Sequence, residues 1–127
     1  MKDVVRTEAA PAPFQGAPYS QAIKANGFVF VSGQLSLKPG DKELTAGDIG
    51  SQTEQVFANL RAILEEAGTS LDNVVKTTVF LQDLGDFAGM NEVYAKHVCE
   101  RPPARSTVEV AALPSGARVE IEAIATI

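Results

Sequence analysis

The feature that most constrains the fold is an amphipathic helix placed between strand-like runs. Between Ile49 and Ala67, apolar side chains follow the 3.6-residue period of a helix, whereas Glu54, Arg61 and Glu65 fall on the opposite side. The apolar stripe consists of Ile49, Val56, Leu60, Ile63, Leu64 and Ala67. A helix with one apolar face must bury it against another layer, and the β-branched runs before and after it predict that this layer is a sheet. Gly68 is suited to end the helix.

Two strands are predicted ahead of this helix. Residues 9–18 are rich in proline and should form an extended lead-in. Tyr19–Ala25 and Phe28–Gln34 have strand composition, and the Asn26-Gly27 pair between them is a strong hairpin signal. Residues 37–47 are polar and predict a loop.

The second half of the chain continues the alternation. Val74–Leu81 predicts a strand whose apolar density indicates burial on both faces. Asp86 is a candidate N-cap for a second helix, which Pro102-Pro103 would end. The side chains that share one face of this helix are Phe87, Met90, Tyr94 and Val98. With two further strands at the end of the chain, the order β-β-α-β-α-β-β predicts one α+β domain over residues 1–127, with both helices on one face of a mixed sheet.

The other face of this sheet needs a cover. Several strand positions are too apolar for a surface left in water, namely Val29, Val31, Val79, Leu81, Ile121 and Ala123. Another copy of the chain is the simplest cover, so the sequence predicts a homo-oligomer with clefts at its interfaces.

Composition narrows the classes of function. The 127 residues include 11 basic and 16 acidic side chains, giving a net charge of −5, so nucleic acid is a poor candidate for the main partner. No apolar run reaches the length of a membrane-spanning helix, and the N-terminus lacks the apolar core of a secretory signal. The single cysteine, Cys99, excludes an internal disulfide and suits a reducing compartment, so we expect a cytoplasmic protein.

Two charged residues occupy the predicted strands at the end of the chain. Arg105 lies in the run 103–110, and Glu120 lies in the run 117–125. If both strands belong to one sheet, the two side chains can face the same cleft, where the guanidinium fork would bind a carboxylate and Glu120 would transfer protons. A carboxylate beside Arg105 should stay ionised. The alternatives are a structural ion pair of Arg105 with Glu120 or Glu122, and a solvent-facing position for Glu120.

The motifs also carry a family resemblance. Pro103-Ala104-Arg105-Ser106, Leu113-Pro114 and the run 119–123 are similar to the signature of the reactive intermediate deaminases, the Rid or YjgF family. The segments 12–22, 30–34, 75–84 and 86–94 resemble further motifs of that family, in the same order.

The resemblance implies a chorismate-mutase-like fold, assembled as a homotrimer with active sites between subunits. It implies hydrolysis of 2-imino acids and their enamine tautomers, such as 2-iminobutanoate and 2-iminopropanoate, to 2-keto acids and ammonia. It implies no metal or cofactor, and the sequence contains no His/Cys cluster at ligand spacing.

The resemblance also implies roles for single residues. Arg105 would bind the substrate carboxylate, and Glu120 would serve the catalytic water. The remaining positions that match the family's pocket are Tyr19, Ser32, Gly33 and Asn91. At position 107 this chain has Thr107 where family members often have cysteine, and the backbone carbonyl there would help to hold the water. This difference leaves the subfamily and the preferred substrate open.

Each of the other polar residues also has an interpretation that requires no catalytic role. Tyr19 could be a packing residue, and Asn91 could lie on the surface. Ser32 lacks the Gly-x-Ser-x-Gly elbow of a nucleophile, which favours a hydrogen-bonding role. His97 and Cys99 are interpreted as packing or surface residues.

Two other functions stay open. The chain could be a non-catalytic trimer that binds small acids or acts as a chaperone, which would need Arg105 but not Glu120. A weaker alternative is an endoribonuclease or translation inhibitor, a class that the acidic charge does not favour.

Overall fold

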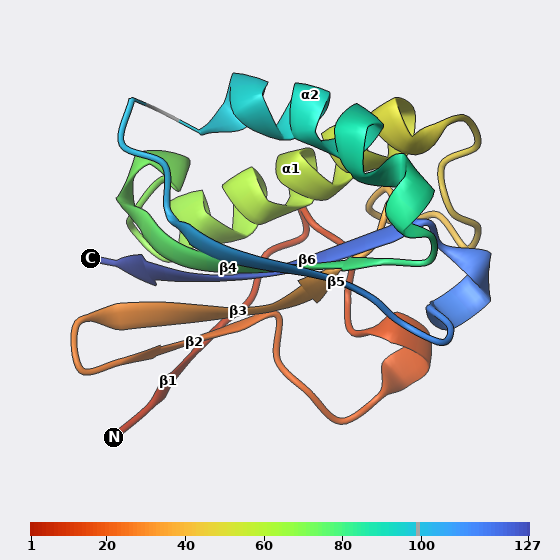
Figure 1. The fold of residues 1–127 in the computed structure, drawn as a ribbon. Helices are drawn as coiled ribbons and strands as arrows, with labels where there is room; N and C mark the ends of the chain where they lie inside the picture. The colour runs from red at the N-terminus through yellow and green to blue at the C-terminus, as the bar shows by residue number, and fades with distance from the viewer. Residues whose placement is uncertain (99) are drawn as a thin grey trace.

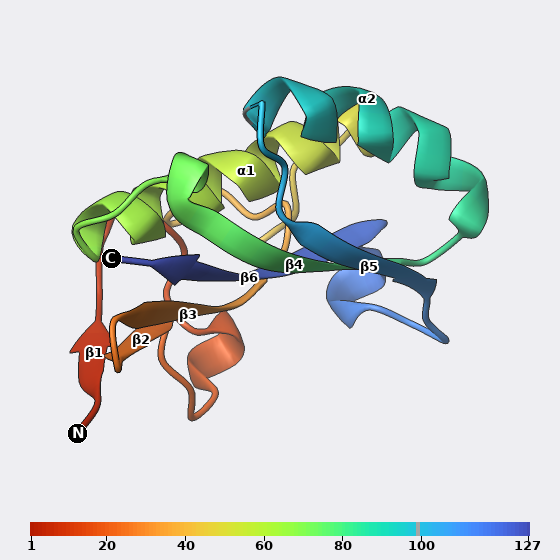
Figure 2. The ribbon, with the colours of Figure 1, turned by 60° about the vertical axis from the view of Figure 1, so that its left-hand side comes forward.

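The computed structural model describes residues 1–98 and 100–127, so the interpretation of Cys99 lies outside the described residues. A mixed sheet is covered on one face by two helices, and its other face is open (Figures 1 and 2). The strands are β1 (Asp3–Val5), β2 (Ala22–Ala25), β3 (Phe28–Gln34), β4 (Val74–Leu81), β5 (Ala104–Glu109) and β6 (Val119–Thr126). The helices are α1 (Ile49–Glu66) and α2 (Phe87–His97). This is the α+β architecture that the sequence predicts, with both helices on one face.

The order of strands across the sheet is β1-β2-β3-β6-β4-β5. Neighbouring strands are antiparallel except β4 and β5, which are parallel and joined through α2. The hairpin between β2 and β3 turns at Asn26 and Gly27, which both have positive φ, as the sequence predicts. The second strand is shorter than expected, because Tyr19 to Gln21 lie outside it. The short strand β1, which pairs with β2, was not predicted.

Helix α1 begins and ends where its sequence indicates. The side chain of Asp48 accepts a hydrogen bond from the backbone N–H of Ser51 at 2.9 Å, which caps the first turn. Gly68 follows the helix with a φ of 89°, a conformation that glycine adopts without strain. The predicted apolar stripe is confirmed, since Val56, Leu60, Ile63 and Leu64 are buried against the sheet. Among the described residues, no helix is both long and apolar enough to span a membrane.

Helix α2 follows Asp86 as expected, but the Asp86 side chain makes no capping hydrogen bond. Its carboxylate instead accepts two hydrogen bonds from Arg118, at 2.8 and 3.1 Å, which tie the start of α2 to the segment leading into β6. The helix ends at His97, before the two prolines. His97 has the packing role expected for it, because its ring stacks on Phe57 with 4.6 Å between ring centroids.

The prediction assigned the apolar strand positions to the wrong face of the sheet. The strand positions expected to need a second copy (Val29, Val31, Val79, Leu81, Ile121 and Ala123) are all buried within this chain, beneath the helices. The open face instead carries Phe28, Phe30, Val75 and Val108, which are 39–44% exposed. Strand β4 is therefore buried on one face only. Apolar residues occur on both faces of β4, so composition alone could not tell the covered face from the open one.

Candidate functional site

Arg105 and Glu120 do not face a common cleft within one chain. Strand β4 lies between β5 and β6, so the two charged residues are not on neighbouring strands. Arg105 is in register with Thr77, which points toward the helices, whereas Glu120 is in register with Phe80, which lines a pocket on the open face. The expectation that the two meet across adjacent strands is therefore wrong for a single chain. Strand order and register, which place them on opposite faces, were not predictable from spacing along the sequence.

A pocket of about 670 Å³ surrounds Glu120 on the open face. Four of the predicted site residues line it: Tyr19, Ser32, Gly33 and Glu120. Apolar side chains, among them Phe14, Leu35, Leu37, Phe80 and Pro114, form much of the remaining lining. We call the four predicted residues together with Phe80 the Glu120 half-site. The pocket places an ionisable carboxyl group among both apolar and polar side chains.

Gly33 makes room for the Glu120 carboxyl group. The pairing of β3 with β6 shifts register between Val31 and Gln34, and Gly33 lies at this irregularity. A Cβ atom at position 33 would lie 2.8 Å from Cδ of Glu120 and 3.1 Å from its Oε1. Glycine is therefore required here for the observed position of the carboxyl group.

The pocket changes the acidity of Glu120. Burial raises the pKa of Glu120 above its ordinary value, and the nearby Glu122 carboxylate raises this pKa further. The sequence-based expectation was the reverse, that an adjacent Arg105 would keep the carboxylate ionised. It fails in the single chain because Arg105 is on the other face. A carboxyl group with a raised pKa is suited to taking up and releasing a proton.

Hydrogen bonds fix the wall of the Glu120 half-site. The Ser32 hydroxyl donates to the backbone carbonyl of Ser20 at 2.6 Å, so it is engaged in holding the segment that carries Tyr19. The Tyr19 hydroxyl accepts a hydrogen bond from the backbone N–H of Phe14. The buried Gln21 side chain, which sequence reasoning missed, donates to the carbonyls of Thr7 and Pro11 at 3.0 and 2.8 Å. Gln21 lies within the run Tyr19–Ala25 that was predicted as a strand, where the local pattern does not mark its side chain as buried.

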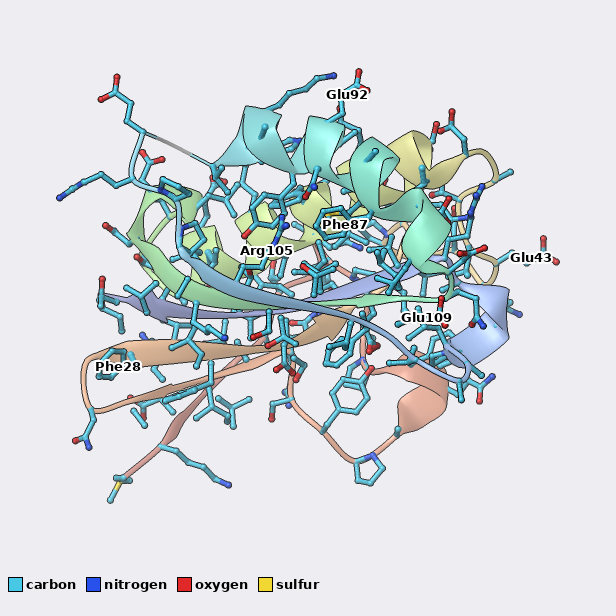
Figure 3. All side chains as sticks on the ribbon, viewed as in Figure 1. Phe28, Glu43, Phe87, Glu92, Arg105 and Glu109 are labelled. Atoms are coloured by element: carbon cyan, nitrogen blue, oxygen red, sulfur yellow. The ribbon has the colours of Figure 1, made fainter. Side chains whose placement is uncertain are left out.

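Arg105 lies on the helix-covered face, at the edge strand β5. Its guanidinium carbon is 4.7 Å from the ring centroid of Tyr94 and 5.4 Å from that of Phe87, both on α2. Figure 3 shows Arg105 and Phe87 between β5 and α2. Among residues 1–98 and 100–127, no carboxylate lies within ion-pair distance of Arg105. A structural ion pair with Glu120 or Glu122 is therefore excluded within the chain.

The remaining predicted site residues accompany Arg105. Asn91 is four residues after Phe87 and three before Tyr94 on α2, so it lies on the same side of the helix. Thr107 is two residues after Arg105 on β5 and points to the same face. Its buried hydroxyl has no hydrogen-bond partner in the described part of the chain. We call Arg105, Asn91, Thr107, Phe87 and Tyr94 the Arg105 half-site; the sequence indicated no role for the two aromatic residues in contacting Arg105.

The donor set does not suggest a metal centre. Within the described ranges, no group of three or more His, Cys, Asp or Glu side chains is arranged to hold a metal ion. The chemistry that the two half-sites offer is anion binding by a guanidinium and proton transfer by a carboxyl group.

Comparison with known proteins agrees with the motifs and the fold. Residues 7–127 match the family described as Endoribonuclease L-PSP. The chain is 54% identical over 125 residues to a RutC family protein of Pyrococcus horikoshii, covering 98% of each chain. It is 52% identical over 126 residues to Reactive Intermediate Deaminase A, chloroplastic, of Arabidopsis thaliana, covering 99% of this chain and 66% of that protein.

The fold has close counterparts among solved structures. The structure of Escherichia coli TdcF with bound serine superposes with a TM-score of 0.89 at 38% identity, covering 98% of each chain. The chain belongs to the Endoribonuclease L-PSP family, which is the Rid or YjgF family that its motifs resemble.

Proposed function

We propose that this chain is a hydrolytic deaminase that converts reactive 2-imino acids and their enamine tautomers to 2-keto acids and ammonia in the cytoplasm. The proposed substrates are 2-iminobutanoate and 2-iminopropanoate. The name of the Arabidopsis relative, Reactive Intermediate Deaminase A, supports the reaction class. The serine bound to TdcF supports a ligand of the size of a small amino acid.

The observation that carries this proposal is the position of the Glu120 carboxyl group, which is half-buried in a pocket that Tyr19, Ser32 and Gly33 also line. In the proposed reaction, water adds to C2 of the imine while Glu120 accepts a proton from that water. Glu120 returns this proton to the imine nitrogen, which gives a carbinolamine with a C2 hydroxyl and an amino group. Glu120 then transfers the proton of the C2 hydroxyl to that nitrogen, the C–N bond breaks, ammonia leaves, and the C2 oxygen becomes the keto group. Such acid–base assistance typically contributes about 10²- to 10⁴-fold in rate.

Neither half-site is sufficient for this reaction. Among the described residues that line the Glu120 pocket there are two carboxylates and no lysine or arginine, so the pocket alone would repel a substrate carboxylate. The Arg105 half-site offers a cation but no carboxyl group for proton transfer. We infer that Arg105 of one subunit meets Glu120 of another. The exposed apolar side chains of the open face offer an assembly surface, and three copies follow from the family resemblance.

The proposal is tested by measuring release of 2-keto acid while a dehydratase generates the imine in the assay. We expect Arg105→Ala to abolish detectable acceleration and Glu120→Gln to do the same. Glu122→Gln is the control, because Glu122 lines the same pocket but has no assigned role in proton transfer; it should keep turnover, with a pH profile moved to lower pH because Glu122 no longer raises the pKa of Glu120. Turnover at the wild-type rate in Arg105→Ala or Glu120→Gln would contradict the mechanism.

A small-acid-binding protein without catalysis is the alternative that Arg105, which has no carboxylate partner among the described residues, also supports. Glu120→Ala separates the two functions. Loss of turnover with retained affinity for 2-oxobutanoate supports the deaminase. Equal turnover and equal affinity in wild type and variant support the binder.

The family description makes ribonuclease activity a second alternative. The net charge of −5 does not favour it, and RNA affinity that does not weaken with added salt would count further against phosphate contacts.

A further inference from the structure

The Arg105 guanidinium is held by aromatic rings rather than by a carboxylate. We propose that Tyr94 is a positioning residue, which fixes the orientation of this guanidinium for the carboxylate of the substrate. The inference rests on the proposed function, because it assigns Tyr94 a role in the step in which Arg105 binds substrate. Tyr94 itself need not touch the substrate.

The two rings around Arg105 are not equivalent. Tyr94 is 5% exposed and its ring centroid is the closer one, at 4.7 Å from the guanidinium carbon. Phe87 is 40% exposed and lies at 5.4 Å. The Tyr94 ring is therefore the fixed support inside the protein, and the Phe87 ring borders the accessible side.

The Tyr94 ring is anchored to the strand position beside Arg105. Its hydroxyl shares a buried hydrogen bond of 2.7 Å with the hydroxyl of Thr77. Thr77 is directly in register with Arg105 in the parallel pair of β4 and β5. One bond thus ties the ring to the residue next to Arg105 in the sheet.

A second contact restricts the tilt of this ring. Phe57 of α1 is 1% exposed and meets Tyr94 edge-on, with 5.4 Å between centroids and 80° between the ring planes. The ring is thus held by the sheet through Thr77 and by the helix layer through Phe57. A buried ring with two such contacts has little freedom to turn.

Support by a ring has a chemical advantage over support by a carboxylate. A cation–π contact attracts the guanidinium through its face and leaves the N–H donors at its edge unoccupied. A structural carboxylate would accept those same donors, and the substrate would have to displace it. The arrangement therefore orders a flexible arginine side chain while keeping its bidentate fork free for a ligand.

The proposal is tested with four variants and two measurements. Tyr94→Leu removes the ring, Tyr94→Phe and Thr77→Val each remove one partner of the hydrogen bond, and Arg105→Ala removes the supported group. The first measurement is the NMR shift of the Arg105 Nε–H, which needs no ligand. The second is the Kd for 2-oxobutanoate by calorimetry, in each variant and in the double variant Tyr94→Leu/Arg105→Ala.

We expect the Arg105 Nε–H signal to be displaced by ring currents in the wild type and to lose most of that displacement in Tyr94→Leu. The same variant should raise the Kd about 2- to 30-fold, the range of a cation–π contact. Tyr94→Phe and Thr77→Val should each raise the Kd by a smaller factor, and combining them should add little, because both remove the same bond. In the Arg105→Ala background, Tyr94→Leu should leave the residual affinity unchanged, which a purely structural role for Tyr94 would not predict.

The proposal is overturned if folded Tyr94→Leu keeps the wild-type signal and Kd, or if it weakens binding equally with and without Arg105. If Tyr94→Leu does not fold, the variants Tyr94→Phe and Thr77→Val test the proposal instead. A wild-type Arg105 Nε–H signal and a wild-type Kd in both variants would overturn it. Absence of keto-acid binding and turnover in the wild type would refute the proposed function instead. In that case the ring-current measurement alone still decides whether Tyr94 orders Arg105.

Discussion

The carboxyl group of Glu120 occupies space that the absent side chain of Gly33 leaves free. A Cβ at position 33 would lie 2.8 Å from Cδ and 3.0 Å from Cγ of Glu120, closer than ordinary contacts allow. The atoms in the way belong to a side chain rather than to the backbone, so Glu120 would move and the sheet would persist. The effect of a substitution at Gly33 should therefore appear first in the position of this carboxyl group.

We predict that Gly33→Ala lowers keto-acid production at least tenfold and destabilises the protein by no more than about 1 kcal/mol, the low end of the overpacking range, because the Glu120 side chain can move into the pocket. Activity is measured in the imine assay, and stability by urea unfolding. The matched control is Gly33→Ala in the Glu120→Ala background, where the clash is absent and the destabilisation should largely disappear. An equal loss of stability in both backgrounds would show that Gly33 serves the backbone of β3 rather than Glu120.

At the level of elements, the contact of Arg118 with Asp86 joins α2 to β6. Arg118 is two residues before Glu120, and Asp86 immediately precedes Phe87, so this pair links the segments that carry the two half-sites. The environment of the pair is asymmetric, since the Asp86 side chain is 14% exposed and that of Arg118 is 42% exposed. Removing Arg118 therefore leaves a mostly buried carboxylate, whereas removing Asp86 leaves a partly exposed guanidinium.

We predict that Arg118→Met destabilises the protein more than Asp86→Asn does. The first variant leaves a mostly buried carboxylate without its cation, whereas the second leaves an arginine that can turn to water. The difference should be about 1 kcal/mol in urea unfolding at neutral pH. The double variant is the control, and it should be more stable than Arg118→Met alone. Equal costs for the two single variants would mean that the pair is fully solvated.

The elements themselves were largely predictable because their signals are local. Asn26-Gly27 specified the hairpin, the stripe in α1 specified the buried helix face, and Val74–Leu81 was predicted with the bounds that the structure gives. The strand β1 was missed because its three residues are too few to display a period. The predicted capping hydrogen bond of Asp86 was wrong, and its pairing with Arg118 was missed, since that partner lies 32 residues away.

At the level of the whole molecule, the separation of the half-sites makes assembly part of the proposed chemistry. Arg105 and Glu120 lie on opposite faces of one sheet, so the proposed site would need two chains. In a ring of identical subunits, each chain would give its Arg105 half-site to one site and its Glu120 half-site to the next. This arrangement can be distinguished from a site within one chain by mixing variants.

We predict that Arg105→Ala and Glu120→Ala subunits, each inactive alone, regain activity when refolded together. With random assembly at equal amounts, about one quarter of the sites would receive both wild-type residues. The imine assay measures the recovered rate, and each variant refolded alone is the control. No recovery in mixtures that light scattering shows to be oligomeric would exclude an intersubunit site of this composition.

The sequence alone determined most of the helices and strands, the apolar face of α1, and which residue types are available for chemistry. These properties depend on neighbours within a few positions, because side chains repeat with the period of the backbone. The tertiary structure decided that β4 lies between β5 and β6, that Arg105 rests on Tyr94, and that Glu120 lies against Gly33. Strand order and register arise from packing between residues far apart in the chain, and in a sheet a shift of one position transfers a side chain to the other face.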